Sequence, residues 1–414
     1  MIKVCDAIMG SGKSSAAITY INEHPDKRFI YITPYLDEAK RIARGCAGTV
    51  HLYEPRKTEK FHGSKTLHTI DHIQNGRSVA TTHQAFRCYP RELLELIAEK
   101  GYTLIIDESL NLFESIKVPP GDMQMVMDAG YVELVQDEER DEDDVFRLVK
   151  GAYEGGSLNT FFRTLQARDI IRIKRKNGGQ AMFFWLFPPE LFLAFEDVIV
   201  LTYQFEGQSM SHFFQLNNLE YSNIGIDHPN ETTYRFSESG LYVPEYVSAL
   251  QDKIHILDKP KLNAVGQDKW ALSMAWFSKD PDLVDRLKKN VYNYFSNIAR
   301  VPLEDRLWGT YKDARWKLRG SGYWSRHLPF NRRATNDYRN CTSLAYCSNV
   351  FMNVTQKQYY HKHGIDANED LFALSTMVQW IWRSAIRDGK EITIYIPSHR
   401  MRELLEKWIQ EVSA

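Results

Sequence analysis

Short apolar runs alternate with polar, helix-like stretches along the first half of the chain. The runs are rich in β-branched and aromatic residues, which favour strands. They cover residues 2–8, 29–33, 78–82 and 104–107, with a fifth much later at 198–202. Polar stretches with helical character, 14–22 and 36–44, lie between the early runs. This alternation is typical of a parallel α/β sheet.

The second half of the chain repeats this α/β character. Strands are predicted at 271–277, 343–347 and 392–396, and helices at 280–298, at 371–387 and from Ser398 onwards. The gap between Ser109 and Asp197 is too long for one crossover connection, so it predicts an inserted subdomain. The predicted organisation is a first lobe at 1–109, an insertion at 110–196, the last strand of the first lobe at 197–207 and a second lobe at 208–414.

Each early run ends in a polar or glycine-bearing turn, and ligands of open parallel sheets bind at such strand ends. The first turn, Ala7-Ile-Met-Gly-Ser-Gly-Lys-Ser14, has the pattern of a phosphate-binding loop with Ala in place of the usual first Gly. Backbone N–H groups from Gly10, Ser11, Gly12, Lys13 and Ser14 can surround a β-phosphate at a helix N-terminus. Lys13 can reach the β- and γ-oxygens, and the Ser14 hydroxyl can bind Mg²⁺.

Two adjacent carboxylates, Asp107 and Glu108, lie at the end of the apolar run 104–107. Asp107 can hold the shell of a Mg²⁺ ion, and Glu108 can orient and polarise an attacking water. A phosphate-binding loop alone permits a kinase, a GTPase or an ATPase. The two motifs in this order favour a nucleoside triphosphate hydrolase over a small-molecule kinase.

A third set of polar residues lies near the C-terminus. Gln379, Arg383 and Arg387 are spaced i, i+4, i+8, so a helix would place them along one face. Arginine suits the charge that develops on a γ-phosphoryl group, because guanidinium stays cationic and binds two oxygens at once. A solvated basic helix face is the alternative for this segment.

The net charge of the 414-residue chain is −1, so a polyanionic partner requires a local basic patch. Residues 300–333 carry a net charge of +6 and contain six aromatic residues. Cations bind phosphates and aromatic faces stack on bases, so this segment predicts a single-strand contact. The predicted contact residues here are Arg315, Trp316, Lys317, Arg319 and Trp324.

Three residues at strand ends are further candidates for phosphate contacts: Thr33, Thr82 and His83. Each of them equally suits a turn or a helix cap. The basic segment 163–176 fits either a nucleic-acid contact or the polar face of a helix, whereas the acidic run 137–144 fits a solvated loop.

The cysteines and the apolar segments of the chain indicate the cellular compartment in which we expect the protein. Five cysteines without a CxxC pair argue against a disulfide framework or a zinc knuckle and favour a reducing compartment. The first residues lack the pattern of a secretory signal, and the most apolar segment, 181–195, is too short for a membrane span. We expect a cytoplasmic protein, in the host cytoplasm if it is viral, with no membrane partner.

The motifs, in this order, resemble those of the superfamily-two helicases and translocases. AIMGSGKSS resembles motif I, and YITPYLDEA (31–39) and VATTHQAF (79–86) resemble the next two motifs. IIDES resembles motif II without being DEAD or DEAH, and LTYQF (201–205) stands where motif III is found. RRATNDYRN (332–340) and QWIWRSAIRDG resemble motifs V and VI. More narrowly, the chain is similar to divergent helicase-like proteins of viruses and bacteriophages.

The resemblance implies two tandem RecA-like P-loop NTPase lobes with an inserted subdomain in the first. It implies ATP and Mg²⁺ as cofactors, with Ser15 joining the loop in the nucleotide site, and Gln379, Arg383 and Arg387 acting from the second lobe. The implied activity is nucleic-acid-stimulated ATP hydrolysis coupled to lobe closure, in viral or phage DNA replication, recombination or repair.

The implied partner is single-stranded or forked nucleic acid, with DNA favoured over RNA. Replication or recombination proteins are further expected partners, and the protein is expected to act as a monomer on the strand. The alternative is an ATP-gated DNA-binding or recruitment protein, such as an origin-recognition or replisome scaffold, without unwinding activity.

Overall fold

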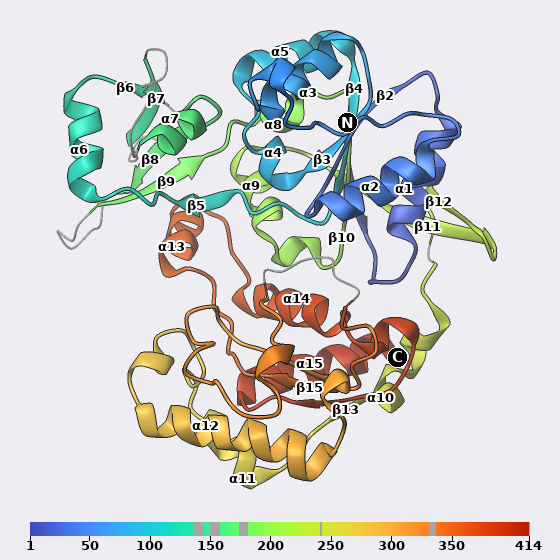
Figure 1. The fold of residues 1–414 in the computed structure, drawn as a ribbon, viewed down its shortest axis with the longest axis vertical. Coiled ribbons are helices and arrows are strands. Elements are labelled where there is room, and N and C mark those ends of the chain that lie inside the picture. Colours follow the sequence, from blue (N-terminus) through green and yellow to red (C-terminus); the bar gives the residue numbers. More distant parts are fainter. Residues whose placement is uncertain (136–143, 150–157, 174–180, 241, 331–336, 414) are drawn as a thin grey trace. The chain divides into compact units, whose positions relative to one another are not determined.

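The computed structural model describes residues 1–135, 144–149, 158–173, 181–240, 242–330 and 337–413 (Figure 1). The chain divides into two compact units. Unit 1 comprises Met1–Asp6, Lys13–Gly240 and Gln358–Ile365, and unit 2 comprises Ala7–Gly12, Leu241–Lys357 and Asp366–Ala414. The sequence analysis began the second lobe at 208, whereas unit 1 continues to Gly240.

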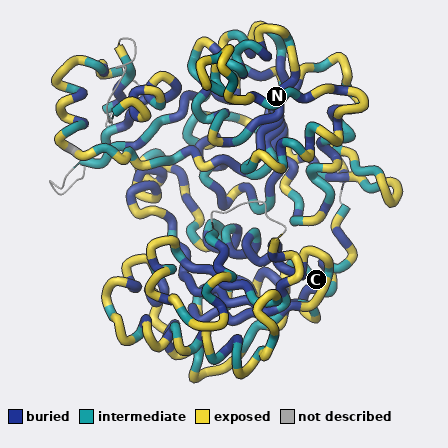
Figure 2. The backbone as a smooth tube through the Cα atoms, viewed as in Figure 1, coloured by how far each residue is buried: buried dark blue, intermediate teal, exposed yellow. Residues whose placement is uncertain are grey.

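Unit 1 is built on a seven-stranded sheet with the order β12-β11-β1-β10-β4-β2-β3. All neighbouring strands are parallel except the outermost pair, β11 and β12. The strands that the sequence predicted are β1 (Ile2–Asp6), β2 (Arg28–Thr33), β3 (Val79–Thr82), β4 (Tyr102–Asp107) and β10 (Asp197–Thr202). The interior strands are buried along most of their length (Figure 2), which explains why their sequences are continuously apolar rather than alternating.

Two strands that the sequence analysis did not predict extend this sheet. β11 (Ser222–Asn230) pairs in parallel with β1, and β12 (Thr233–Ser237) pairs antiparallel with β11. Their sequence is largely polar because their side chains are mostly exposed or half-buried. A strand of this kind lacks the apolar run on which sequence-based prediction depends.

Several helices of unit 1 contribute buried apolar side chains, among them Ile73, Phe86, Leu93, Leu191 and Phe213, to one large core. The main connecting helices are α1 (Lys13–Glu23), α2 (Leu36–Cys46), α3 (Lys65–Gln74), α4 (His83–Phe86), α5 (Arg91–Lys100), α8 (Glu190–Leu193) and α9 (Ser209–Leu216). The first two lie where the sequence predicted helices.

The segment predicted as an insertion folds around a separate five-stranded antiparallel sheet with the order β5-β9-β8-β7-β6. Its strands are β5 (Phe113–Ser115), β6 (Val132–Val135), β7 (Asp144–Leu148), β8 (Asp169–Ile173) and β9 (Met182–Leu186). α6 (Pro120–Asp128) and α7 (Asn159–Leu165) contribute to its own small core, which includes Met123, Phe146 and Phe162. The acidic run predicted at 137–144 lies outside the described residues except for Asp144.

Unit 2 contains a four-stranded parallel sheet with the order β13-β16-β15-β14. Its strands are β13 (Ile254–Ile256), β14 (Arg306–Gly309), β15 (Ser343–Tyr346) and β16 (Ile392–Tyr395). The accompanying helices are α10 (Leu250–Lys253), α11 (Pro260–Asn263), α12 (Pro281–Asn293), α14 (Glu369–Ile381) and α15 (His399–Ser413). α13 (Val354–Lys362) is divided between the units, since its residues from Gln358 onwards belong to unit 1. Both units thus confirm an α/β fold with parallel sheets.

One predicted strand of unit 2 is wrong. Residues 271–277 form turns that lead into a 3-10 turn at Trp276–Ser278. Ala271, Leu272, Trp276 and Phe277 are nevertheless buried in the core, so the apolar pattern reported burial rather than strand geometry. None of the described helices has the length and apolar character that crossing a membrane requires.

Candidate functional site

The loop between β1 and α1 has the backbone of an anion-binding loop. Gly10 and Gly12 have φ angles of +87° and +86°, which residues with a Cβ rarely adopt. α1 begins directly after the loop, at Lys13, and a helix N-terminus favours a bound anion. Ser11 is fully buried, and its Oγ has no hydrogen-bond partner among the described residues. The loop therefore fits a phosphate group.

Lys13, the first residue of α1, is close to the acidic end of β4. Burial lowers the pKa of its ammonium group, while Cys5 and the carboxylates of Glu108 and Asp107 act against this shift. A negatively charged ligand at the loop would likewise favour the charged form of Lys13. The structure thus brings together the lysine of the loop and the two carboxylates that the sequence analysis singled out.

Ser14 and Asp107 are in direct contact, since Ser14 Oγ donates a hydrogen bond to Asp107 Oδ2 at 3.4 Å. Burial, followed by the neighbouring charge of Glu108, raises the pKa of Asp107 from 3.8 to about 6. Two ligands of one Mg²⁺ ion, each about 2.1 Å from it, lie about 3 Å apart in octahedral geometry. The two oxygens therefore fit a shared Mg²⁺ ion.

The described residues contain no group of three or more His, Cys, Asp or Glu side chains that could hold a metal ion. A Mg²⁺ site at Ser14 and Asp107 consequently needs further oxygen ligands. Phosphate oxygens of a nucleotide in the loop can supply them, because Mg²⁺ in nucleotide sites is commonly bound by few protein ligands and the phosphates.

Glu108 has an unusual backbone conformation directly after β4. Its φ angle is +69°, in the left-handed region that residues other than glycine seldom occupy. Its N–H donates to the carbonyl of Leu201 in β10 at 2.9 Å, which ties the end of β4 to the neighbouring strand. Strain of this kind is found where a side chain must be held in one position.

The three residues predicted as phosphate contacts at strand ends have structural partners or are buried. Thr82 caps α4 by accepting a hydrogen bond from the N–H of Ala85 at 3.3 Å. His83 is buried, and its Nε2 lies 2.8 Å from the carbonyl oxygen of Asp107. Thr33 is also fully buried. For Thr82 the helix-cap alternative is the one observed, and His83 positions the backbone at Asp107.

Asp6, at the end of β1, is a site residue that the sequence analysis missed. Its carboxylate accepts hydrogen bonds from the N–H groups of Gln204 and Phe205, at 2.7 and 2.8 Å. It thereby connects the start of the phosphate-binding loop to the turn after β10. A carboxylate at a strand end just before a glycine-rich loop was the available signal.

Gln379, Arg383 and Arg387 do not lie on one helix, so the predicted i, i+4, i+8 stack is wrong. α14 ends at Ile381, Arg383 follows in a turn, and Arg387 belongs to a 3-10 turn at Ala385–Asp388. A surface helix buries only one stripe of its side chains. Here all seven consecutive side chains from 380 to 386 are buried, and five of them are apolar. The chain must leave the helix to bury them.

The two arginines consequently have different surroundings. Arg383 is buried, and its Nε donates to the carbonyl of Gln379 at 3.2 Å. Arg387 is exposed. The next residue, Asp388, accepts a hydrogen bond from Arg339 Nε at 2.7 Å, and Arg339 belongs to the segment that resembles motif V. The first part of that segment, up to residue 336, lies outside the described residues.

The basic and aromatic segment of unit 2 forms a compact surface cluster. The rings of Trp316 and Trp324 are 4.8 Å apart between centroids. Arg315 and Arg319 lie over these rings, with Arg315 Cζ 4.5 Å and Arg319 Cζ 5.4 Å from the centroid of Trp324. Lys317 is turned away, since its Nζ donates to the carbonyl of Phe277 at 2.8 Å. Four of the five predicted residues therefore come together.

The alternatives for the basic segment 163–176 are partly resolved. Arg168 is buried and pairs with Glu114 at 2.9 Å. Arg172 pairs with Asp144 and lies over the ring of Phe146. Arg172 thus forms its contacts within the inserted subdomain, whereas Arg168 also donates to the carbonyl of Arg87 at 3.0 Å, outside it. The lysines of the segment lie outside the described residues.

Comparisons with known proteins agree with this architecture. The solved structure named XPD_APO aligns with 99% of this chain and 95% of its own, with a TM-score of 0.52 and 10% sequence identity. A structure of S. tokodaii Xpd4 aligns with 98% of this chain and 94% of its own, with a TM-score of 0.44 and 12% identity. The first likeness shows that this chain shares the fold of the structure named XPD_APO, and at 10% identity it concerns the fold alone.

Sequence comparison adds a close relative. A family model described as the YonV C-terminal Rossmann-like domain matches residues 248–409, which include all four strands of the sheet of unit 2. The chain is 36% identical to the SPbeta prophage-derived protein YonV of Bacillus subtilis (strain 168), over 99% of this chain and 98% of that protein. A match of this identity and extent shows that the chain belongs to the YonV family.

Proposed function

We propose that this protein is a nucleic-acid-dependent ATP hydrolase of the helicase or translocase class, built from two RecA-like lobes, with the subdomain at 110–196 inserted in the first. The observation that carries the proposal is the contact between Ser14 and Asp107 beside the glycine loop. A phosphate-binding loop and an acidic strand end are the parts that nucleoside triphosphate hydrolysis requires.

Each residue of the site then has a defined task. The N–H groups of the loop bind the phosphates of ATP, and Lys13 neutralises their negative charge. Ser14 and Asp107 would hold Mg²⁺, whose charge offsets the charge that develops on the transferred phosphoryl group. Glu108, held by its backbone contact with Leu201, orients the attacking water and accepts its proton.

Gln379, Arg383 and Arg387 act on the leaving phosphoryl group in this proposal. A guanidinium that reaches this group stabilises its negative charge in the transition state. Hydrolysis is coupled to closure of the two lobes, which converts phosphate chemistry into movement along a strand. The cluster of Arg315, Trp316, Arg319 and Trp324 supplies a contact with that strand.

The relative in Bacillus subtilis is prophage-derived by name, which supports a role in phage DNA replication, recombination or repair. We infer single-stranded or forked DNA as the partner, a cytoplasmic location, action as a monomer on the strand, and contact with other replication or recombination proteins.

The experiment that tests the proposal is phosphate release from ATP with Mg²⁺, measured without nucleic acid and with single-stranded DNA, single-stranded RNA or blunt duplex DNA. We expect stimulation by single-stranded DNA and loss of turnover in Lys13→Ala at unchanged melting temperature, because Lys13 binds phosphate rather than contributing to the core. Normal turnover in a folded Lys13→Ala variant would contradict the proposal. A strand-displacement assay then separates a helicase from an ATP-gated binding protein, which binds DNA without displacing a strand.

A further inference from the structure

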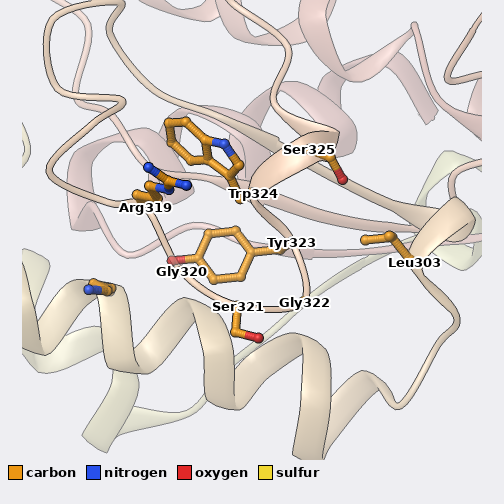
Figure 3. A pocket seen from close by; sticks show the side chains of 9 residues that line it. Leu303, Arg319, Gly320, Ser321, Gly322, Tyr323, Trp324 and Ser325 are labelled. Carbon is orange, nitrogen blue, oxygen red and sulfur yellow. The ribbon is translucent and has the colours of Figure 1, made fainter.

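Unit 2 contains an open pocket of about 510 Å³ beside Trp324. Arg319, Trp324 and the loop at 320–322 line the pocket (Figure 3), and Lys288 of α12 also belongs to its lining. Two of the three loop residues are glycines, so the wall of the pocket here is largely backbone. None of the nine lining residues is acidic. The pocket is therefore suited to a negatively charged ligand.

The two cations of this pocket are available for a ligand. Lys289, the next residue along α12, pairs with Asp285 at 2.7 Å. In the part of the chain that the structure describes, neither Lys288 nor Arg319 has a carboxylate within ion-pair distance. A phosphate bound between two such cations gains charge-assisted hydrogen bonds without displacing an existing carboxylate.

An exposed aromatic ring lies next to the pocket. Trp316 is 64% exposed, an unusual exposure for the largest apolar side chain. Its ring packs against Trp324, which lines the pocket, and Arg319 Cζ lies 6.0 Å from its centroid. Arg315 and Arg319 hold the two indoles by cation–π contacts. A base can therefore stack on the face of a ring whose position is already fixed.

We propose, on the basis of the function proposed above, that this pocket and Trp316 together bind one unpaired nucleotide of a single strand, with the phosphate between Lys288 and Arg319 and the base on Trp316. The proposal extends the predicted strand contact to α12 and to the loop at 320–322. It also assigns a preference for single strands, because a base inside a duplex has no free face to stack on the indole.

The test is the affinity for a fluorescent 20-nucleotide oligothymidylate, measured by anisotropy over a salt series without ATP, with a blunt duplex in parallel. For Lys288→Ala and Arg319→Ala we expect roughly 3- to 10-fold weaker single-strand binding, and a salt slope that is smaller by about 0.7 for each lost phosphate contact. For Trp316→Ala we expect roughly 5- to 150-fold weaker binding at an unchanged slope, because stacking releases no counterions.

Two neighbouring lysines provide matched controls. Lys289→Ala removes a charge one residue away that is already paired with Asp285. Lys317→Ala removes a charge from the same segment as Arg319, although Lys317 Nζ is bound to the carbonyl of Phe277. Both variants should bind the single strand within about twofold of the wild type. Melting temperatures exclude unfolding as the cause of any loss.

Three results would overturn the proposal. One is an equal loss of affinity in Lys288→Ala and Lys289→Ala. The second is duplex binding as tight as single-strand binding. The third is displacement of the strand by adenosine 5′-monophosphate at a concentration equal to that of the nucleotide units in the oligothymidylate. This result would assign the pocket to a free nucleotide. These binding measurements contain no ATP. Strand binding at this pocket can therefore be confirmed even if the protein does not hydrolyse ATP, and ATP hydrolysis can be confirmed even if this pocket does not bind the strand.

Discussion

The hydroxyl of Ser14 lies 3.4 Å from the carboxylate of Asp107, although 93 residues separate the two in the chain. Ser14 is in the first turn of α1, directly after the loop that follows β1, and Asp107 ends β4. β1 and β4 both pair in parallel with β10, so their carboxyl ends lie at the same edge of the sheet. The strand order β1-β10-β4 therefore brings together the two residues on which the proposed nucleotide site depends.

Asp107→Asn should abolish ATP turnover and stabilise the protein in Mg²⁺-free buffer. Burial beside Glu108 raises the pKa of Asp107 to about 6, above its value in the unfolded chain. Folding then favours the protonated carboxyl, so the contribution of this group to stability falls as the pH rises from about 4 to about 6 and stays low above that. At pH 8 the neutral amide should raise the free energy of unfolding by about 1–2 kcal/mol, allowing for partial exposure.

Urea unfolding of the wild type and Asp107→Asn at pH 8 and pH 5 measures this effect. The gain should fall to about half at pH 5, because the native carboxyl is then already largely protonated. A gain that is the same at both pH values would show that the charge of Asp107 is not its cause.

Glu108→Gln should bind ATP and fail to hydrolyse it. The amide keeps the size of the side chain and the contact of the Glu108 N–H with Leu201, but it cannot accept a proton from water. Loss of a general base typically lowers the rate about 10²–10⁴-fold. Single-turnover phosphate release measures ATP hydrolysis, and equilibrium binding measures the affinity for ATP, so the two measurements separate a loss of hydrolysis from a loss of binding. Glu99→Gln, on the exposed side of α5, is the matched control, and wild-type release by Glu108→Gln would exclude this role.

The parts of the site that could be predicted are those that a few adjacent residues encode. The glycines before Lys13 and the apolar run before Asp107 each combine a strand with the chemistry at its end. These signals are local because a buried parallel strand requires a continuous apolar run. The order of the strands in the sheet then determines which strand ends lie close together.

Side-chain partners distant in sequence could not be predicted in this way. His83 has the position of a phosphate contact in sequence, yet its ring binds the carbonyl of Asp107. Arg383 and Arg387 have helical spacing, yet α14 ends at Ile381, and the consecutive side chains that follow, up to Ile386, are all buried. Such outcomes depend on tertiary packing, which overrides local propensity.

Arg383→Ala and Arg387→Ala should both lower ATP hydrolysis more than ATP binding, with different effects on stability. Arg387 is exposed, so its loss should leave the melting temperature unchanged. Arg383 is buried and bonded to the carbonyl at Gln379, so its loss should also lower the melting temperature. For either variant we expect at most the lower end of the roughly 10³–10⁵-fold effect of an arginine finger. Unchanged hydrolysis in both variants would leave this turn with a structural role alone.

The last prediction concerns the connection between the inserted subdomain and the main sheet of unit 1. Asp169, at the start of β8, is 5% exposed and accepts hydrogen bonds from Arg91 of α5 and Arg147 of β7, each at 2.8 Å. Asp169→Asn leaves two guanidinium groups without their shared carboxylate. Because both arginines are partly exposed, we expect a loss of about 1–3 kcal/mol rather than the larger cost of a fully buried pair.

Thermal unfolding of Asp169→Asn should therefore shift to lower temperature. ATP turnover measured well below the unfolding transition should stay within about twofold of the wild type, because this contact lies outside the proposed site of hydrolysis. Asp285→Asn, which breaks an exposed pair with Lys289 on α12, is the matched control and should leave the melting temperature unchanged, because solvent screens such pairs. A loss of turnover in folded Asp169→Asn would instead mean that the position of the inserted subdomain controls hydrolysis.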